Sequence, residues 1–544
     1  MTADILVKNG MVMDGTGRPS FRADVIIEGD RIKDVGLFPD AEAAHEIDAQ
    51  GLVVAPGLID VHTHLGFFLP SKRHPEVLKS WIYQGVTTVV AGNCGYSSAP
   101  INHDCEDIIN KYWSFALPRD GLKYEWTTMG NYFDYLETNG LALNAAFLTG
   151  HNTLRTNVMG FEARFANQDE IAEMKRMLKE SMEAGSIGLS LGLYYCPGVF
   201  SHTDEIMDLA SILTEYEAPV VPHTRGGSET YPEAVDEVIR VAEKNKIPLQ
   251  ISHIGCFVPN DPSLLERAKQ KIKEAQDRGV KVGYDFLASD ASLSTLLSIL
   301  PPWLFDGGFD KFFERITDPE IRRRAIHEFK TVVPEWPNWE HNYWTDNHLR
   351  NAMFSWGHIY AHGIQHQVNK KFNGMTIEAI ASEMGKDPFN ALFDLIAEEG
   401  RSIIVSGLRD KSIPKMISDP NCSFETDIVG PDLEISHNTI AYGGFTKILG
   451  RFARDEGVLT QEEAVRKMTS LPAEQMGLKN RGLVQKGAFA DIAIFNPETV
   501  NSRATFEDPY QLSEGIEYVL INGRLVLEED NYHKNALAGT VIKR

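Results

Sequence analysis

Histidine, cysteine and aspartate residues recur at the ends of short apolar segments along the middle of the chain. The segments are GLIDVHTHL (57–65), GVTTVVAGNCG (85–95), NAAFLTGH (144–151), SIGLSLGLYY (186–195), PVVPHTRG (219–226), PLQISHIG (248–255), KVGYDFLA (281–288) and CSFETDIV (422–429). Helical patterns lie between several of them, for example at 169–185 and 263–279, each ending in glycine. Strands that alternate with helices form βα units, and eight units predict an α/β fold, the parallel (β/α)₈ TIM barrel.

Both ends of the chain have a different texture from this middle part. Short stretches there alternate apolar and polar residues and are separated by Asn-Gly and Gly-Asp pairs, which favour tight turns. Two β-rich ends around a different middle predict that the termini meet. We expect residues 1–55 and 480–544 to form one small β-sandwich domain, with the catalytic barrel over residues 56–479.

One connection between predicted strands is too long for a plain barrel loop. At about residues 300–375 the chain is rich in aromatic residues and proline, as in ILPPWLFDGGFDKFF and PEWPNWEHNYW. Long connections inside compact domains are usually functional, often as a cover over a site. We therefore expect a lid-like insertion at about 300–375.

Net charge and cysteine content limit which binding partners and which cellular compartment we expect. The 544 residues carry a formal net charge of −23, which would repel a phosphate backbone, so no nucleic acid and no anionic membrane is expected as a partner. No run approaches the ~18 apolar residues of a membrane span, and no secretory signal is visible. The five cysteines are scattered and odd in number, which fits reduced thiols. We expect a cytoplasmic protein that binds a small molecule, and the sequence leaves a homo-oligomer open.

Side chains with metal-ligand chemistry lie at or next to the C-terminal ends of the predicted strands, on the face where barrel enzymes keep their active sites. They are His62, His64, Cys94, His223, His253 and Asp427. Imidazole, thiolate and carboxylate groups suit zinc, whose catalytic sites keep one position open. The set predicts Zn²⁺, one or two ions per subunit, because six ligands exceed the needs of one ion. Two ions bridged by the thiolate and one tight site beside a weak one both fit.

Each of these residues has an ordinary structural explanation when taken alone. A histidine at a strand end is often structural, and a buried cysteine after a Gly-rich run is usually a small core residue. Asp427 lies beside Glu425 and Asp432 and could belong to an acidic surface loop. Core packing does not explain why all six fall at the same end of independently predicted strands, so we predict a metal centre.

Segments spread over nearly the whole chain carry a family resemblance. They are APGLIDVHTH, GVTTVVAGNCGYSSAP, GHNTLR, GLYYCPG, PHTRG, QISH, GMTIEAIASEMGKDPFNALFDLI and the run from YGGFTKILG to ADIAIFNP. Together they resemble the N-acyl-D-amino-acid deacylase (D-aminoacylase) branch of the amidohydrolase superfamily. The resemblance implies a metal-binding barrel with a β-sandwich built from both termini. It also implies a zinc-dependent hydrolase that cleaves the C–N amide bond of an N-acyl amino acid or a related amide.

The resemblance also implies how the metals are held. Much of the superfamily bridges two metals with a carboxylated lysine on strand four, and SIGLSLGLYY has no lysine. The deacylase branch uses the cysteine of the GNCG run instead, which is Cys94 here. A tight zinc is then implied at Cys94, His223 and His253. A weaker or absent second metal is implied at His62, His64 and Cys94.

Amide hydrolysis needs a strong nucleophile and a protonated leaving nitrogen. Zinc lowers the pKa of bound water to about 7, and one carboxylate can serve as base and then as acid. By resemblance, Asp427 is this general base. His151, in GHNTLR, could donate to the oxyanion or anchor its loop. Tyr195, in GLYYCPG, matches a substrate-facing position, with a core aromatic as its alternative.

The sequence departs from the deacylase pattern at the positions where relatives bind the carboxylate of the substrate. The lysine usual after the strand-six histidine is absent from the HIGC run at 253–256, and HNT at 437–439 replaces the usual His-Pro-Arg. Arg225 is retained as a candidate for substrate binding. Phe67, in an apolar run, either lines the substrate pocket or packs the barrel mouth. We expect a substrate that is less anionic and more apolar than an N-acyl-D-amino acid.

Three other functions stay open. A cyclic-amide hydrolase of the hydantoinase or dihydropyrimidinase kind would share the chemistry, although the missing strand-four lysine counts against that subfamily. A deaminase of the same superfamily would release ammonia. A silent scaffold normally loses metal ligands, and here all six remain.

Overall fold

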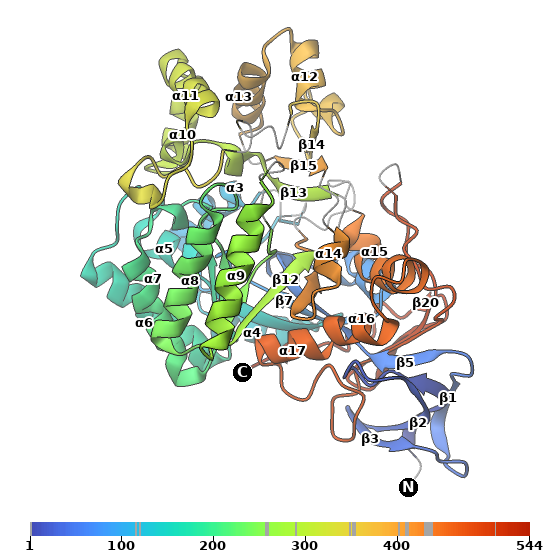
Figure 1. Ribbon diagram of the computed structural model, residues 1–544. Helices are drawn as coiled ribbons and strands as arrows, with labels where there is room; N and C mark the ends of the chain where they lie inside the picture. Colours follow the sequence, from blue (N-terminus) through green and yellow to red (C-terminus); the bar gives the residue numbers. More distant parts are fainter. Residues whose placement is uncertain are drawn as a thin grey trace.

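The structure is a computed structural model with three parts: a barrel, a sheet built from both chain ends, and an inserted unit (Figure 1). It describes residues 3–114, 117–118, 121–255, 261–288, 291–347, 350, 355–400, 403–408, 413–428, 439–505 and 508–544, without the side chains of 291–293, 404–408 and 413. Within these ranges, none of the helices is both long and apolar enough to cross a membrane.

Eight strands, each paired in parallel with the next, form the barrel. They are β6 (Leu58–Thr63), β7 (Val86–Ala91), β8 (Asn144–Gly150), β9 (Gly188–Gly192), β10 (Val220–His223), β11 (Leu249–Ile251), β12 (Val282–Leu287) and β16 (Cys422–Glu425). The barrel closes between its first and last strands, where Asp427 N donates to His62 O at 3.0 Å and His64 N to Ile428 O at 3.1 Å. The (β/α)₈ prediction is confirmed, with every predicted strand in its place.

Helices pack around the barrel where the sequence alternates apolar and polar faces. The predicted helix at 169–185 is α6 (Gln168–Ala184), which begins with a capping box of Asn167 and Glu170 and ends at Gly185 in the left-handed region. The second predicted helix is α9 (Ser263–Asp277). The other barrel helices are α1 (His74–Val77), α2 (Lys79–Ile82), α3 (Glu106–Tyr112), α4 (Met129–Asn139), α5 (His151–Met159), α7 (Thr203–Ala210), α8 (Tyr231–Asn245), α14 (Ile413–Ile417), α15 (Ile440–Lys447), α16 (Gln461–Met468) and α17 (Ser470–Met476).

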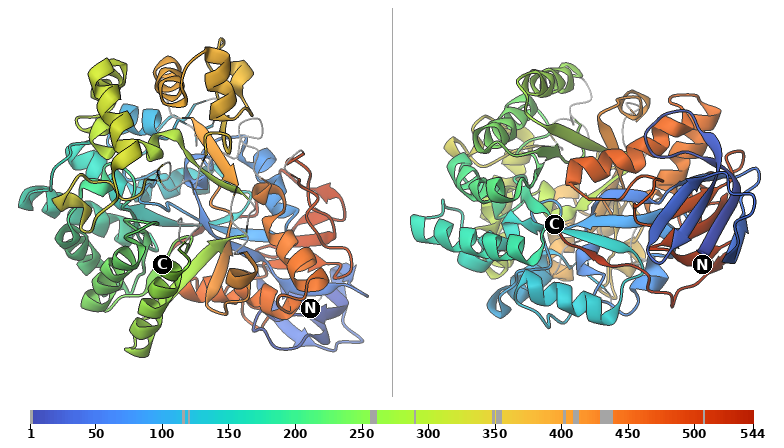
Figure 2. Two further views of the ribbon diagram at one scale, coloured as in Figure 1. Left: turned by 45° about the horizontal axis from the view of Figure 1, so that its top comes forward. Right: turned by 90° about the horizontal axis from the view of Figure 1, so that it is seen from below.

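Strands from both termini lie side by side in one mixed sheet, seen from below in Figure 2. They are β1 (Ala3–Val12), β2 (Phe21–Glu28), β3 (Arg31–Gly36), β4 (Ala43–Asp48), β5 (Val53–Pro56), β17 (Ile492–Phe495), β18 (Ile516–Ile521), β19 (Arg524–Glu528) and β20 (Asn531–Tyr532). The pairing of β5 with β17 joins the two chain ends, and apolar side chains of both, such as Val7 and Ile494, share one buried core. A small β domain built by both termini is confirmed. The last strand, β21 (Val541–Ile542), leaves this domain and pairs with β8 of the barrel, although the prediction assigned residues 480–544 to the β domain.

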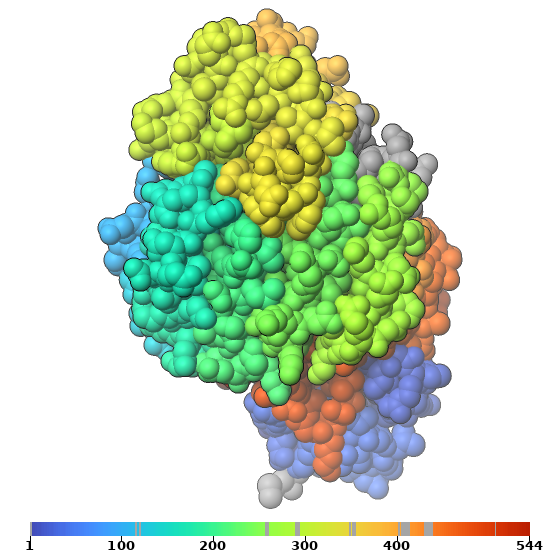
Figure 3. All heavy atoms as spheres, turned by 60° about the vertical axis from the view of Figure 1, so that its left-hand side comes forward, coloured from blue at the N-terminus to red at the C-terminus, as the bar shows by residue number. Residues whose placement is uncertain are grey.

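The inserted unit lies between β12 and β16. A three-stranded antiparallel sheet of β13 (Ala291–Thr295), β15 (Ile404–Leu408) and β14 (Ile359–His362) forms its base. Its helices are α10 (Phe309–Thr317), α11 (Pro319–Thr331), α12 (Ile377–Met384) and α13 (Pro388–Glu399). The unit thus extends past the predicted range of 300–375 on both sides. It follows the C-terminal end of β12 and rests on the barrel in Figure 3, so it covers the face that carries the candidate ligands. Its movement as a lid stays a prediction.

A buried carboxyl group ties the inserted unit to the barrel. The Asp346 carboxyl oxygens accept the backbone N–H of Gly227, which follows β10, at 2.9 and 3.1 Å. Burial raises the pKa of Asp346 to about 7, although its hydrogen bonds with Ser228 and Gly227 oppose this shift. An ionised carboxylate at this contact therefore carries a desolvation cost.

This pKa predicts a pH-dependent contact. Because the pKa is raised from its ordinary 3.8, the stabilising effect of the protonated Asp346 is complete below about pH 4 and lost as the pH rises to about 7. Asp346→Asn cannot ionise, so its melting temperature relative to wild type should rise over this pH window. Circular dichroism melts measure it, with Asp310→Asn, whose side chain is 91% exposed, as the control. A difference that does not change with pH would contradict this account.

Candidate metal centre

The predicted ligands converge at the C-terminal end of the barrel around the thiol of Cys94. Its Sγ lies 3.3 Å from His62 Nε2, 3.6 Å from His223 Nδ1 and 3.5 Å from His253 Nε2. The nitrogens of His223 and His253 lie only 2.8 Å apart. Donor atoms from four different strand ends thus face one small volume.

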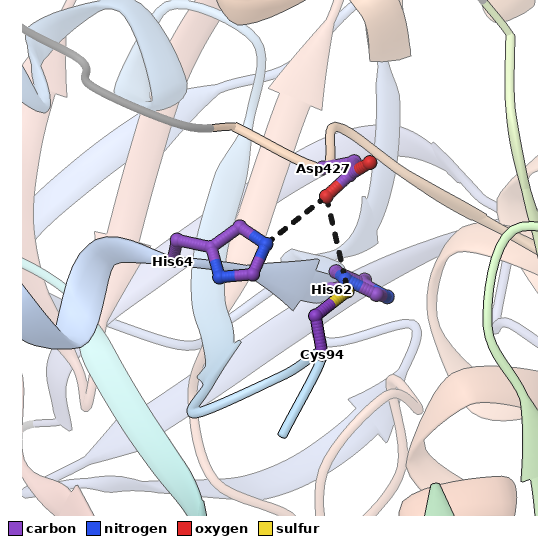
Figure 4. Close-up of side chains that lie close together, drawn as sticks. All are labelled: His62, His64, Cys94 and Asp427. Carbon is purple, nitrogen blue, oxygen red and sulfur yellow. Dashed lines mark hydrogen bonds and ion pairs between the residues drawn. The ribbon is translucent and has the colours of Figure 1, made fainter. Parts of the chain in front are cut away.

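Asp427 completes the cluster on the side of the first strand. Its Oδ1 lies 3.2 Å from His64 Nε2 and 3.4 Å from His62 Nε2, as drawn in Figure 4. Four donors, His62, His64, Cys94 and Asp427, lie within 4.8 Å of one another. Cys94 also belongs to a second such group with His223 and His253. The two groups share the thiol, so the arrangement suits two ions with a common sulfur ligand.

The backbone is strained at three of these positions. Cys94, His253 and Asp427 have φ values of +51°, +35° and +47°, in the region that favours glycine. Each lies just after a barrel strand: β7, β11 and β16 respectively. Such a conformation costs about 1–3 kcal/mol per residue and concentrates at functional sites. The left-handed turn is what directs each side chain back over the barrel mouth.

Burial sets the charge of the donors. It lowers the pKa of His62 and of His223 well below the ordinary value, so both imidazoles are neutral and keep a lone pair. Burial also raises the pKa of the Cys94 thiol. For Asp427 burial acts to raise the pKa, but the imidazoles of His62 and His64 outweigh it and hold the pKa below its ordinary value. Neutral imidazoles, a thiol and a carboxylate, largely buried although Asp427 keeps 18% of its side chain exposed, fit a divalent zinc ion.

A buried carboxyl that the sequence analysis did not assign holds this geometry. Asp60, on β6, accepts hydrogen bonds from Trp81 Nε1 at 2.9 Å and from the backbone and hydroxyl of Thr426 at 3.0 and 2.6 Å. Thr426 immediately precedes Asp427, so Asp60 ties the general-base candidate to the strand that carries His62. An aspartate inside an otherwise apolar strand was the available signal.

Aromatic rings flank the donors on two sides. The ring of Tyr195 lies 4.7 Å from that of His223. The indole of Trp113 lies 5.1 Å from the ring of His64 and stacks on Phe67 at 5.6 Å. Phe67 is buried and lies one ring away from His64. The substrate-binding roles of Tyr195 and Phe67 stay predictions, and Trp113 had no motif that pointed to it.

His151 lies in a buried ionic network. Its Nε2 lies 2.7 Å from Glu205 Oε1, and Glu205 also pairs with Arg155. This contact anchors the start of α5, as the structural alternative for His151 expects. Its Nδ1 is buried and has no hydrogen-bond partner within the described ranges. The oxyanion role of His151 stays a prediction.

Arg225 lies in a second buried network. Its Nε donates to Glu237 at 3.1 Å and its Nη1 to Val199 O at 3.2 Å, while the guanidinium stacks on Trp339 of the inserted unit at 4.9 Å. The side chain is 1% exposed. Its substrate-binding role stays a prediction, and the geometry shows that the guanidinium already has protein partners on several nitrogens.

The segments that break the deacylase pattern are only partly visible. Ile254 and Gly255 follow His253, and Gly255 N donates to Tyr231 Oη at 3.2 Å. Cys256, His437 and Asn438 lie outside the described residues. What holds the substrate's polar end therefore stays a prediction.

An amidohydrolase family model matches residues 45–527. The chain belongs to this family. The D-aminoacylase of Alcaligenes xylosoxydans xylosoxydans is 30% identical over 99% of this chain and 98% of the relative. A D-aminoacylase with a binuclear metal centre superposes with a TM-score of 0.81 at 28% identity, over 100% of both chains. The N-acyl-D-glutamate deacylase of Bordetella bronchiseptica, complexed with zinc and a phosphonate inhibitor, gives a TM-score of 0.80 at 27% identity, over 100% of both chains.

The resemblance to the deacylase branch is thereby confirmed. The chain is a metal-dependent amidohydrolase, a hydrolase of carbon–nitrogen bonds. Within the described residues, two groups of such donors share Cys94 at the C-terminal face of the barrel.

The shared thiol predicts how metal content responds to substitution. Cys94→Ala removes a donor from both groups, so both ions should be lost, whereas His62→Ala should remove only the ion on its side. Metal analysis after zinc loading and dialysis measures the content, with circular dichroism as a check on folding. Cys105→Ala, at a buried cysteine that hydrogen-bonds Thr156 O, is the matched control. Wild-type zinc content in Cys94→Ala would refute the shared-ligand arrangement.

Proposed function

We propose that the chain is a zinc-dependent hydrolase that cleaves the C–N amide bond of an N-acyl amino acid or a related amide. One observation carries this: imidazole, thiol and carboxylate donors from separate strands meet at the C-terminal face of a barrel. Membership of the amidohydrolase family and the zinc bound to the Bordetella relative support it. A small-molecule amide as partner and a cytoplasmic location are part of the same proposal.

Cys94, His223 and His253 would hold the tight zinc, and His62 and His64, with Cys94, a second ion. Bound zinc supplies a Lewis acid that makes water nucleophilic near neutral pH and polarises a carbonyl oxygen. The D-aminoacylase relative is described as activated by one metal and attenuated by the second. That description supports one catalytic ion here.

Asp427 is the general base in this proposal. Its carboxylate faces the same volume as the metal donors, at 3.2 Å from His64 Nε2, and its backbone turn holds it there. It would take a proton from the attacking water and return it to the leaving nitrogen as the C–N bond breaks. The proton is transferred within the site, and no external acid or base is needed.

The substrate would lie against the aromatic rings beside the donors. Tyr195 would face it next to His223, and the stacked pair of Phe67 and Trp113 would border its apolar part near His64. His151 would donate to the oxyanion from Nδ1 only as an imidazolium, because the single proton of the neutral ring lies on Nε2 against Glu205. Arg225 would bind a carboxylate only by sharing a guanidinium that Glu237 already holds. A neutral or weakly anionic amide fits this environment better than a strongly anionic one.

Asp427→Asn tests the base. The amide cannot accept the proton, so kcat should fall by about 10²–10⁴-fold. Zinc content measured on the same sample separates a lost base from a lost ligand, and a fall in kcat with the tight zinc retained supports the assignment. Asp419→Asn, at a half-buried aspartate paired with Lys269, is the control. Wild-type kcat in Asp427→Asn would overturn the role.

A substrate panel tests the class of amide. We expect a higher kcat/KM for neutral, apolar amides or cyclic amides than for N-acetyl-D-amino acids, because the cations that relatives use are missing from the runs at 253–256 and 437–439. Product amine, carboxylate and ammonia are assayed together, so a deaminase would show itself by ammonia release. Efficient turnover of N-acetyl-D-amino acids with neutral amides untouched would contradict the substrate part of the proposal.

A further inference from the structure

Two carboxyl side chains occupy the barrel interior behind His62. Nδ1 of His62 lies 3.0 Å from Glu425 Oε2, and both side chains have 0% exposure. Asp285, on the neighbouring strand β12, is also buried. Ligand-type atoms of His62, Asp285 and Glu425 lie within 4.8 Å of one another. Neither carboxyl has a role in the function proposed above.

Carboxyl groups are costly at this depth. The interior of a (β/α)₈ barrel is normally filled by branched apolar side chains. Burying a polar group without compensating hydrogen bonds is unfavourable. Filling the space with apolar side chains would avoid this cost, so the placement of Glu425 and Asp285 calls for a role that apolar residues cannot fill.

The two ring nitrogens of His62 face different neighbours, and this arrangement gives Glu425 a specific role. Its Nε2 faces Cys94 Sγ at 3.3 Å and Asp427 Oδ1 at 3.4 Å, which is the side of the metal donors. A neutral imidazole carries one proton, so a lone pair on Nε2 requires the proton on Nδ1. Glu425 Oε2 lies 3.0 Å from Nδ1, at an angle short of a hydrogen bond, and a carboxylate oxygen can accept the Nδ1 proton once the ring turns toward it. Metal-bound histidines generally use such an outer acceptor to fix tautomer and ring orientation.

Asp285 extends this support to the other side of the centre. One of its oxygens accepts the backbone N–H of His253, the residue whose φ is +35°. Its second oxygen accepts Gln250 Nε2 at 2.9 Å. Asp285 therefore holds the strained turn that aims His253 at Cys94, and its carboxyl lies within 4.8 Å of Glu425 and of His62.

We infer that Glu425 is a positioning residue that orients His62 toward the second metal, and that Asp285 joins this support to the turn of His253. The inference rests on the proposed zinc function. Glu425 contacts no reacting atom; it acts through the imidazole of His62. A carboxyl with a merely structural role would change stability without singling out one of the two ions.

Glu425→Gln tests the inference in the full-length enzyme. The amide keeps the shape of the side chain but accepts the His62 proton more weakly, so the second zinc should bind about 10–100-fold more weakly while the tight zinc stays. Competition with a chromophoric chelator gives the two zinc affinities, and metal analysis gives the stoichiometry. Asp491→Asn, at a buried carboxyl ion-paired with Arg481 beside β17, is the matched control and should bind zinc as wild type does.

The outcomes are separable. A wild-type enzyme with two zinc ions and a Glu425→Gln variant that retains both with unchanged affinity overturns the inference alone. A wild-type enzyme that binds no zinc overturns the proposed function as well. In a His62→Ala background Glu425→Gln should have no further effect on zinc binding, and an additional loss would count against the inference. If Glu425→Gln does not fold, Glu425→Asp replaces it, because its shorter carboxyl cannot reach Nδ1 of His62 equally well. The two zinc affinities are measured in the same way, and the same weakening of the second zinc is expected.

Discussion

The seam between β6 and β16 is the interaction on which the site depends. His62 and His64 alternate along the first strand, and Asp427 follows the last, so they meet only because the barrel closes there. Backbone hydrogen bonds across the seam fix the register, and Asp60 adds three side-chain hydrogen bonds to Trp81 and Thr426. A slip of one residue would turn every side chain of the strand to the other face. The seam therefore sets both the fold and the distances among the donors.

Closing the barrel also concentrates polar groups that water no longer solvates. Neutral imidazoles crowd the Cys94 thiol, and the nitrogens of His223 and His253 lie 2.8 Å apart. Lone pairs that face one another in a buried volume are unfavourable unless a proton or a cation lies between them. The strained turns at Cys94, His253 and Asp427 add to this cost. A divalent cation among the donors would offset both costs, so metal binding would recover energy that the scaffold stores.

The sequence was sufficient for the parts that depend on local pattern. Apolar segments bounded by turns located all eight strands, and the position of His62, Cys94 or His253 at a strand end followed from the same pattern. The direction in which a side chain points beyond the end of a strand was not predictable from the sequence. Arg225 lies two residues after His223, where β10 has already ended, so alternation no longer applies and the guanidinium turns to Glu237. Trp113 reaches His64 from a distant connection without a motif.

Asp285 and Glu425 show a second limit of prediction from sequence, which is the pairing of strands that are distant in the chain. Each was visible in the sequence as a carboxylate in an apolar strand, Asp285 inside β12 and Glu425 at the end of β16, where a ligand, an acidic loop residue and an interior group look alike. Their roles depend on which strands become neighbours: β12 pairs with β16, and β16 closes on β6. Only that order places Glu425 beside His62 and Asp285 under His253. The polar interior of this barrel thus arises from closure, which turns two isolated acidic residues into support for both halves of a metal centre.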